Sequence, residues 1–157
     1  METRATAFLK AQHVAFTLHP YDYVDRGGTK VSSQKLGVPE HAVVKTLVFE
    51  TETQSPLLVL MHGDRQVSAK ALARQLGVKQ VKPCKPEVAE RHTGYQVGGT
   101  SPFGTKKTLP VCCERSITAL ERLYINAGGR GLLCALVPSE LVRVLTPTLV
   151  DCAAAEP

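Results

Sequence analysis

Two glycine-rich segments are the parts of this sequence whose residue types point most directly to chemistry. The first reads GGTSPFG over residues 98–104, and the second reads NAGGRG over residues 126–131. Glycine lets another molecule approach the backbone, so such loops can expose N–H donors that polarise a carbonyl or hold a phosphate without any side chain. The same composition also suits simple tight turns, which are common. Both segments are therefore candidate binding loops.

One lysine lies inside an otherwise apolar stretch, VVKTLVFE, at residues 43–50. If this stretch is a strand, Lys45 shares a face with Leu47 and Phe49, because side chains alternate with a period of two. Lysine is seldom fully buried without a partner. One interpretation is that Lys45 lies near the start of the strand and extends its amine to water. The other is a cation held in a pocket to meet an anionic or carbonyl-bearing substrate.

Several catalytic patterns do not occur in the chain. It has neither G-x-x-x-x-G-K-[ST] nor G-x-G-x-x-G, so binding of a nucleoside triphosphate or a dinucleotide is unsupported. It also lacks the G-x-S-x-G elbow and the short signatures of a cysteine nucleophile. Ser101 has no histidine near it in sequence, so it is a candidate nucleophile only through a spatial neighbour. If the protein is an enzyme, its site relies on positioning and backbone dipoles.

The cysteines and histidines do not form a metal-binding pattern in the sequence. There are five cysteines, without a C-x-x-C pair, and five scattered histidines, without an H-E-x-x-H motif. The cysteines are best interpreted as small apolar core residues. We expect no bound metal and no cofactor.

Positive charge is concentrated in one part of the chain. The formal net charge is +5, yet residues 65–107 carry nine lysines and arginines against two glutamates, a net +7. A localised positive block is typical of a protein that binds a polyanion, most often nucleic acid. A solvated basic surface that binds nothing is an equally good interpretation of charge alone.

Periodicity and capping residues predict the elements that must position these groups. We expect a helix capped by Thr3 and a final helix over residues 139–145. Between them we expect three helices that end at glycines: residues 29–36 ending at Gly37, a helix capped by Ser68 ending at Gly77, and a helix opened by Pro86 ending at Gly94. We expect strands over residues 14–19, 43–50, 57–62, 95–97, 108–112, 122–127 and 132–137, the second and third forming a hairpin.

This mixture predicts an α+β fold with a mixed, mostly antiparallel sheet. Helices and strands occur without strict alternation, which argues against a parallel α/β arrangement. The 157 residues, of which 43% are hydrophobic and 21% charged, suit one domain over residues 1–157, with a frayed tail from about residue 148. The longest apolar run, residues 57–61, is too short for a membrane span, and the N-terminus does not resemble a signal peptide. We expect a soluble, cytoplasmic protein.

Three segments together resemble a known family. VVKTLVFE, GYQVGGTSPFGTKKTLPV and YINAGGRG, in this order and at these separations, are similar to the YbaK/EbsC aminoacyl-tRNA deacylases, relatives of the editing domain of bacterial prolyl-tRNA synthetases. The similarity runs from about residue 8 to residue 145. It implies a barrel-like mixed sheet surrounded by helices. It also implies a free-standing editing enzyme that removes wrong amino acids from tRNA, chiefly cysteine from tRNA for proline.

The resemblance also implies which residues form the site. The motif lysine of the family falls on Lys45, and a tyrosine of the early loop on Tyr21. The G-G-x-S-P-x-G loop falls on Gly98, Gly99, Ser101, Pro102 and Gly104, and the G-x-R-G loop on Gly128, Arg130 and Gly131. Lys45, Gly98, Gly99 and Ser101 are the implied catalytic positions. We expect Lys70, Arg74, Lys106 and Lys107 to contact tRNA.

In cysteine-specific members, the implied mechanism is substrate-assisted. The thiol of the substrate attacks its own ester carbonyl and leaves as a cyclic thioester, so the protein supplies positioning and oxyanion stabilisation. In this context, the pocket interpretation of Lys45 is favoured over the solvent-exposed one.

The chain departs from the family pattern at Thr100, Phe103, Asn126 and Leu133, which line or border the expected pocket. Alternatives are therefore a water-dependent deacylase for Ser-, Thr- or Ala-charged tRNA, and a binding module for tRNA or a synthetase without chemistry. Prolyl-tRNA synthetase is a possible partner that supplies tRNA selection.

Overall fold

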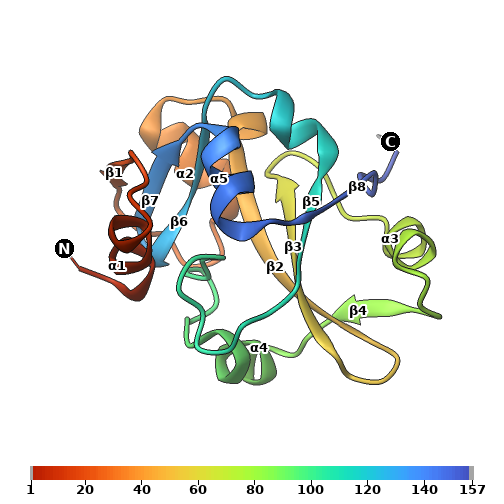
Figure 1. The fold of residues 1–157 in the computed structure, drawn as a ribbon. Coiled ribbons are helices and arrows are strands. Elements are labelled where there is room, and N and C mark those ends of the chain that lie inside the picture. Colours follow the sequence, from red (N-terminus) through yellow and green to blue (C-terminus); the bar gives the residue numbers. More distant parts are fainter. Residues whose placement is uncertain (1, 156–157) are drawn as a thin grey trace.

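Residues 2–155 are described by a computed structural model and form an eight-stranded mixed sheet with five α-helices around it (Figure 1). The helices are α1 (Arg4–Ala11), α2 (Gly28–Leu36), α3 (Ala69–Leu76), α4 (Pro86–Thr93) and α5 (Pro138–Leu145). The strands are β1 (Thr17–Pro20), β2 (Val43–Thr51), β3 (Pro56–His62), β4 (Val81–Pro83), β5 (Val111–Glu114), β6 (Leu123–Gly129), β7 (Leu132–Leu136) and β8 (Thr148–Val150). Two 3-10 helices, Glu40–Ala42 and Arg115–Ala119, precede β2 and β6.

The sheet follows the order β1-β7-β6-β2-β3-β5-β8, and β4 pairs with β2 beside this path. The pairs β1–β7, β6–β7, β2–β3 and β2–β4 are antiparallel, and the pairs β2–β6, β3–β5 and β5–β8 are parallel. The predicted α+β fold with a mixed, mostly antiparallel sheet is confirmed. The sheet does not close into a barrel, because β1 and β8 end the order without pairing with each other.

Strand β2 separates from its neighbour β6 soon after it begins. The parallel ladder between them ends at the pair Val44 and Ile125. On the same side, pairing resumes only where the Cys84 N–H donates to the Val48 carbonyl, at 2.9 Å, next to β4. Residues 45–47 therefore lie at a gap in the sheet, with β3 on one side and no strand on the other.

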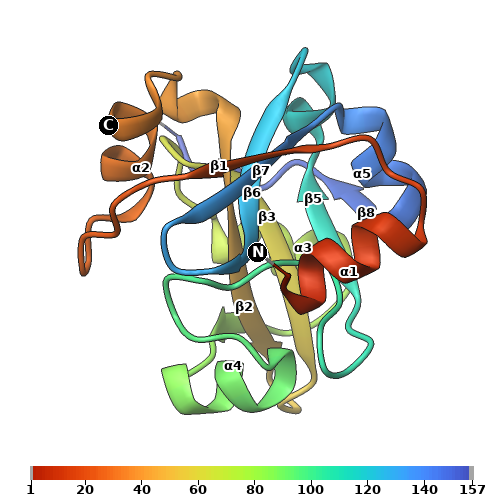
Figure 2. The ribbon, with the colours of Figure 1, turned by 90° about the vertical axis from the view of Figure 1, so that its left-hand side faces the viewer.

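The two faces of β2 bury different clusters. Val44 packs with Leu9 of α1 and Leu141 of α5, whereas Phe49 packs with Leu72 of α3. Figure 2 shows α1 and α5 on one side of the sheet and α2 on the other. Because side chains alternate along a strand, Lys45 lies on the same face as Leu47 and Phe49, as the sequence predicts.

Helix boundaries follow the predicted capping residues. Thr3 accepts a hydrogen bond from the Thr6 N–H at the start of α1, and Ser68 accepts one from Ala71 at the start of α3. Pro86 occupies the first turn of α4. Helices α2, α3 and α4 end at Gly37, Gly77 and Gly94, all three in the left-handed conformation.

Two predictions of local structure are wrong. Residues 95–97 are irregular and lead into a turn instead of forming a strand, and the Tyr95 hydroxyl donates to the Phe103 carbonyl further along the same segment. The tail is not frayed over residues 148–155: β8 pairs with β5, and Val150 and Cys152 are buried. Residues 156–157 lie outside the described residues. Strand β4 was not predicted, since its three residues carry no periodic signal.

A buried carboxylate holds the C-terminal segment in place. One oxygen of Glu114 accepts from the Cys152 and Ala153 N–H groups at 2.8 and 3.1 Å, and the other accepts from the hydroxyl and N–H of Ser116. Burial raises the pKa of this carboxyl, but these hydrogen bonds outweigh it and hold the pKa below its ordinary value of 4.5. The ionised Glu114 therefore stabilises the fold.

No helix among residues 2–155 has the length and apolar character needed to span a bilayer.

We predict that Glu114→Ala destabilises the protein by about 3 kcal/mol at neutral pH, because it leaves buried N–H groups without an acceptor. The folded-state pKa lies below the unfolded one, so the contribution is complete above about pH 4.5 and is lost as pH falls through the folded-state pKa. Urea unfolding at neutral and acid pH measures both effects. Glu121→Ala, at an exposed position, is the control. Equal midpoints for the two variants at neutral pH would contradict this role of Glu114.

Candidate functional site

A cavity of about 720 Å³ opens where β2 and β6 diverge. Its walls come from β2, the loop between β1 and α2, the first turns of α2, the segment around residue 98 and the turn between β6 and β7. Six residues expected at the site line it: Tyr21, Lys45, Gly98, Thr100, Asn126 and Arg130. The structure thus brings strand β2, which carries Lys45, and both glycine-rich segments, which are far apart in sequence, around one space.

Thr46 presents unsatisfied polar groups at the centre of this cavity. Backbone groups of β2 alternate in direction: the Val43 carbonyl accepts from Gly63 on the β3 side, and the Val48 carbonyl accepts from Cys84 on the opposite side. By this alternation the N–H and C=O of Thr46 face the gap. Neither they nor the buried Thr46 Oγ1 has a hydrogen-bond partner within residues 2–155. Such groups are available to a ligand.

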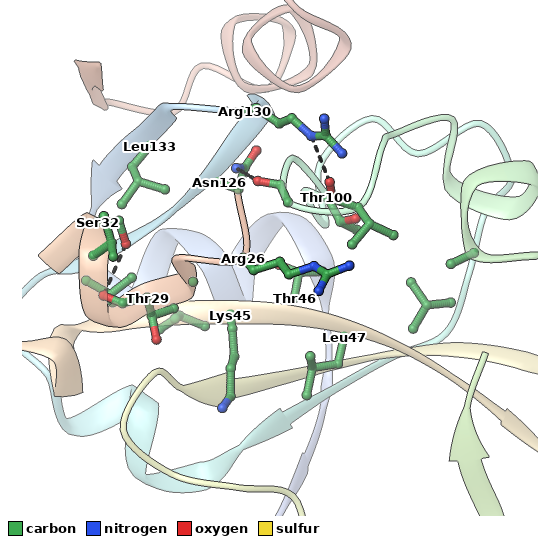
Figure 3. Close-up of a pocket in the computed structure, with 18 of the residues that line it drawn as sticks. Arg26, Thr29, Ser32, Lys45, Thr46, Leu47, Thr100, Asn126, Arg130 and Leu133 are labelled. Carbon is green, nitrogen blue, oxygen red and sulfur yellow. Dashed lines mark hydrogen bonds between the residues drawn. The ribbon is translucent and has the colours of Figure 1, made fainter. Parts of the chain in front are cut away.

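The amine of Lys45 lies on the far side of β2 from the glycine-rich segments. Figure 3 shows Thr100, Asn126 and Arg130 above the strand and the Lys45 side chain extending below it. Its Nζ donates to the Gly63 carbonyl at 3.5 Å, and Lys45 is half-buried. Burial lowers the pKa of Lys45, while the carboxylates of Glu40 and Asp64 oppose this shift. The cation is therefore held in a partly desolvated, acid-flanked position on the face away from the glycine-rich segments, and its role in binding a substrate stays a prediction.

Gly63 joins Lys45 to a neighbouring hydrogen-bond network. The Thr29 hydroxyl lies 2.7 Å from Glu40 Oε2 and 3.2 Å from the Gly63 carbonyl, which is the carbonyl that Lys45 contacts. Gly63 is buried so closely that a Cβ there would lie 2.7 Å from Thr29 and 2.9 Å from the Glu40 carbonyl oxygen. No side chain fits without moving this support.

The two glycine-rich segments are fastened to each other. The Asn126 side-chain amide donates to the carbonyls of Gly98, at 3.3 Å, and Gly129, at 3.0 Å, while its oxygen accepts from the Gly128 and Gly129 N–H groups. The Arg130 Nε donates to the Val97 carbonyl at 3.0 Å. Asn126 and Arg130 therefore shape the cavity wall as well as lining it.

Part of the expected site lies behind the cavity, so we revise its assignment. Ser101, Pro102 and Phe103 are buried and do not line the cavity. The Ser101 hydroxyl accepts from the Phe103 N–H at 3.2 Å, and the Phe103 ring stacks on Phe8 in the core. Gly104 is also absent from the lining, since it packs against the Arg4 backbone. These residues anchor the loop instead of reaching a ligand.

The remaining glycines of the implied motifs make backbone hydrogen bonds or close packing contacts within the protein. The Gly99 N–H already donates to the Gln96 carbonyl at 2.8 Å, which removes it from the expected set of free donors. The Gly131 carbonyl accepts from the Tyr21 N–H at 2.9 Å. Gly128 packs closely against Tyr95 and Thr3. Gly98 and Thr100 thus remain as loop positions at the cavity whose N–H groups have no partner among residues 2–155.

The four basic residues expected to bind tRNA fall into two separate groups. Lys70 and Arg74 lie on α3 beside a smaller cavity of about 350 Å³ that Lys79 also lines. Lys106 and Lys107 are exposed and bond to the end of α4 through their N–H groups. In Figure 1, α3 and the segment after α4 lie on opposite sides of the β2–β3 hairpin. The four residues therefore lie on two surfaces.

Several lining residues were missed from the sequence. They are Tyr23, Arg26, Thr29, Ser32, Thr46 and Cys84. Thr46 had a usable signal, because it adjoins the motif lysine. The other five come from loops and helix starts whose position relative to β2 no sequence pattern specifies. Burial raises the pKa of Cys84 to about 11, so its thiol is protonated and is a poor nucleophile at neutral pH.

One cluster of possible metal ligands was also unexpected. Ligand atoms of His41, His62 and Asp64 lie within 4.8 Å of one another. The two imidazoles are stacked with centroids 3.7 Å apart and planes at 6°, so their in-plane lone pairs do not converge on one point. Both ring nitrogens of His62 are already engaged, with the His41 carbonyl and with Ser116. This geometry does not suit a single ion, and the lack of a metal stays a prediction.

Comparison with known proteins extends the sequence resemblance. A profile described as an aminoacyl-tRNA editing domain matches residues 28–144. The EbsC protein of Enterococcus faecalis, named as a proposed Cys-tRNA(Pro)/Cys-tRNA(Cys) deacylase, is 29% identical over 112 residues, which are 71% of this chain and 68% of EbsC. The proline–tRNA ligase of Limosilactobacillus fermentum is 24% identical over 104 residues, covering 64% of this chain and 18% of the ligase.

A solved structure shares the whole fold. The crystal structure of a proposed trans-editing enzyme for prolyl-tRNA synthetase superposes with a TM-score of 0.84 at 21% identity, covering 99% of each chain. The sheet and the surrounding helices therefore belong to a known fold.

We predict that Gly63→Ala destabilises the protein by about 2 kcal/mol, because the new methyl group must displace Thr29 or the Glu40 backbone. Gly129→Ala is the matched control, since a Cβ there meets only Leu132, at 4.0 Å. We expect the control to stay within about 0.5 kcal/mol of the wild type. Denaturant unfolding of both variants gives the comparison, and equal losses would show that the space around Gly63 is not restrictive.

Proposed function

The chain belongs to the aminoacyl-tRNA editing domain family, and we propose that it is a trans-editing deacylase that removes a wrongly attached amino acid from tRNA. The observation that carries the proposal is the cavity at the β2–β6 gap, where Lys45 and the unpartnered groups of Thr46 line one space. A cation and free hydrogen-bonding groups beside a partly apolar cavity suit an aminoacyl ester, which has a polar carbonyl and a small side chain. The similarity to EbsC supports the same reaction class.

Cysteine on tRNA(Pro) is the substrate we propose, with the thiol of the substrate as the nucleophile. Its sulfur forms a bond to the ester carbonyl carbon, the bond from that carbon to the ribose oxygen breaks, and the thiol proton ends on the ribose oxygen. The products are a cyclic thioester and tRNA with a free terminal hydroxyl. Among the described residues, no histidine lines the cavity to activate a protein hydroxyl, and Ser101 lies outside it. These two facts support a mechanism without a protein nucleophile.

The protein would act by orientation and electrostatics. The N–H groups of Thr46, Gly98 and Thr100 lack partners within residues 2–155, and we assign them to the carbonyl oxygen, where negative charge develops. Lys45 lies on the other side of the strand, so we assign its charge to the substrate's polar end beyond the carbonyl. By holding the sulfur and the carbonyl carbon of the bound ester in an attack geometry, the protein would lower the entropic part of the activation barrier.

Phosphate groups of tRNA are proposed to meet one of the two basic surfaces. Lys70 and Arg74 are exposed on α3, and Lys106 and Lys107 are exposed beyond α4. Because these surfaces lie on opposite sides of the hairpin, one acceptor stem need not contact both. Selection of the tRNA by prolyl-tRNA synthetase, acting as a partner, would add to this non-specific attraction.

We predict release of cysteine from Cys-tRNA(Pro) and a fall of about 100-fold in the rate for Lys45→Ala, because a charge that orients the substrate is lost. Ser-, Thr- and Ala-charged tRNA complete the substrate panel, and acid-precipitable radiolabel measures the remaining ester. Lys35→Ala, an exposed lysine on α2, is the control and should keep full activity.

The product of this reaction separates the mechanisms. A cyclic thioester trapped at short times supports attack by the substrate thiol, whereas free cysteine alone at short times would assign the attack to water. Loss of none of the four amino acids above the Lys45→Ala rate would refute the deacylase and leave a tRNA-binding module.

We predict that Lys70→Gln with Arg74→Gln weakens tRNA binding and lowers the slope of log K against log salt by about 1 to 2, since each phosphate contact contributes about 0.9. The pair Lys106→Gln and Lys107→Gln is tested in parallel, to show which surface carries the contacts. Filter binding at several salt concentrations gives the slopes. An affinity that does not change with salt in the wild type would exclude both surfaces.

A further inference from the structure

The mouth of the cavity carries an unusual pair of exposed apolar side chains. Among residues 2–155, the large hydrophobic side chains that are markedly exposed are Val24, Val97 and Val137, at 44%, 47% and 46%. Val24 and Val97 both line the cavity, whereas Val137 does not. Scattered exposed valines are ordinary, but two at one opening indicate a surface that a ligand covers.

These two valines belong to loops that touch each other. Val24 follows Tyr23, and Val97 precedes Gly98; a Cβ on Gly98 would lie 2.5 Å from the Tyr23 hydroxyl, so the loops are in close contact there. Arg130 adds a second link, because its guanidinium lies 5.3 Å from the centre of the Tyr23 ring while its Nε bonds to the Val97 carbonyl. The valines therefore flank the place where the two loops meet.

Arg26 is a cation at the same opening, and it has no hydrogen-bond or ion-pair partner among residues 2–155. By contrast, Lys45 contacts Gly63, and Arg130 contacts Val97 and Tyr23. Its backbone is left-handed, with φ of 60°, a conformation that costs a non-glycine residue about 1 kcal/mol. Figure 3 shows its guanidinium extending into the space between Thr100 and strand β2.

We propose that this mouth binds the terminal nucleotide of the tRNA, with the base against Val24 and Val97 and the phosphate on Arg26. The inference rests on the proposed function, because the ester is attached to the ribose of that nucleotide. Whatever holds the acyl group in the cavity must leave the nucleoside within a few bonds of it, at the opening. An apolar surface beside a free guanidinium matches a flat base joined to an anion.

Binding of uncharged tRNA tests the site without any chemistry. The wild type should bind tRNA with a complete 3′ end about 10-fold more tightly than the same tRNA lacking its terminal adenosine nucleotide, since base packing and one phosphate contact are both lost. Val24→Ser with Val97→Ser, and separately Arg26→Gln, should each reduce this ratio toward one. The comparison within one variant cancels contacts made elsewhere on the tRNA.

Matched controls guard against general effects. Val137→Ser removes an equally exposed valine outside the cavity, and Lys35→Gln removes one positive charge from α2; both should keep the wild-type ratio. Because the changed side chains are exposed, we expect unfolding midpoints equal to that of the wild type, which identifies any variant that misfolds.

Each outcome has a defined meaning. A wild type that binds both tRNAs equally, or valine variants that keep the full ratio, would overturn the site. Valine variants that change only self-association in sedimentation would assign the patch to a protein interface and overturn it as well. A ratio that depends on these residues in a protein that releases no amino acid would support the nucleotide site while the proposed deacylase fails.

Discussion

The structure depends on the separation of β2 from β6 after Val44. A strand inside a sheet normally satisfies its backbone on both sides, and here residues 45–47 do so on one side alone. The gap exists because β6 turns away into the glycine-rich segment that Asn126 fastens, while β4 reaches β2 only at Val48. A ligand can therefore meet main-chain groups of a rigid strand, whose hairpin with β3 runs deep in the core.

Around that gap, charge and hydrogen bonding are divided between the two faces of the sheet. The glycine-rich side offers backbone donors, and Ser101, Phe103 and Gly104 anchor its loop from behind. The same side carries the cations Arg26 and Arg130. The other face holds Lys45 through Gly63 and the nearby carboxylates, whose attraction opposes the effect of burial on its pKa. The site thus combines backbone donors and two arginines on one face with a separately supported lysine on the other.

The C-terminal segment connects stability to this site. Ser68 and Gln66 pair with the backbone of Cys152 and Ala154, and Glu114 binds the same segment from β5. The loop between β3 and α3, which carries Gly63, is therefore fixed at both ends. The C-terminal segment has no periodic pattern of apolar residues, yet its residues 148–150 form the edge strand β8. Without β8, strand β5 would have an unpaired edge.

By itself the sequence determined the helices with marked caps, the β2–β3 hairpin, the α+β class and the family, because these depend on local periodicity, on turn residues and on three specific motifs. It also placed Lys45 on the face with Leu47. Tertiary structure alone decided that Ser101 and Phe103 are core residues, that Gly99 has no free donor, that the four basic residues expected to bind tRNA lie on two surfaces, and that Arg26 reaches the cavity. Those outcomes depend on contacts between segments far apart in the chain, and the spacing within one segment contains no information about which distant segment it will face.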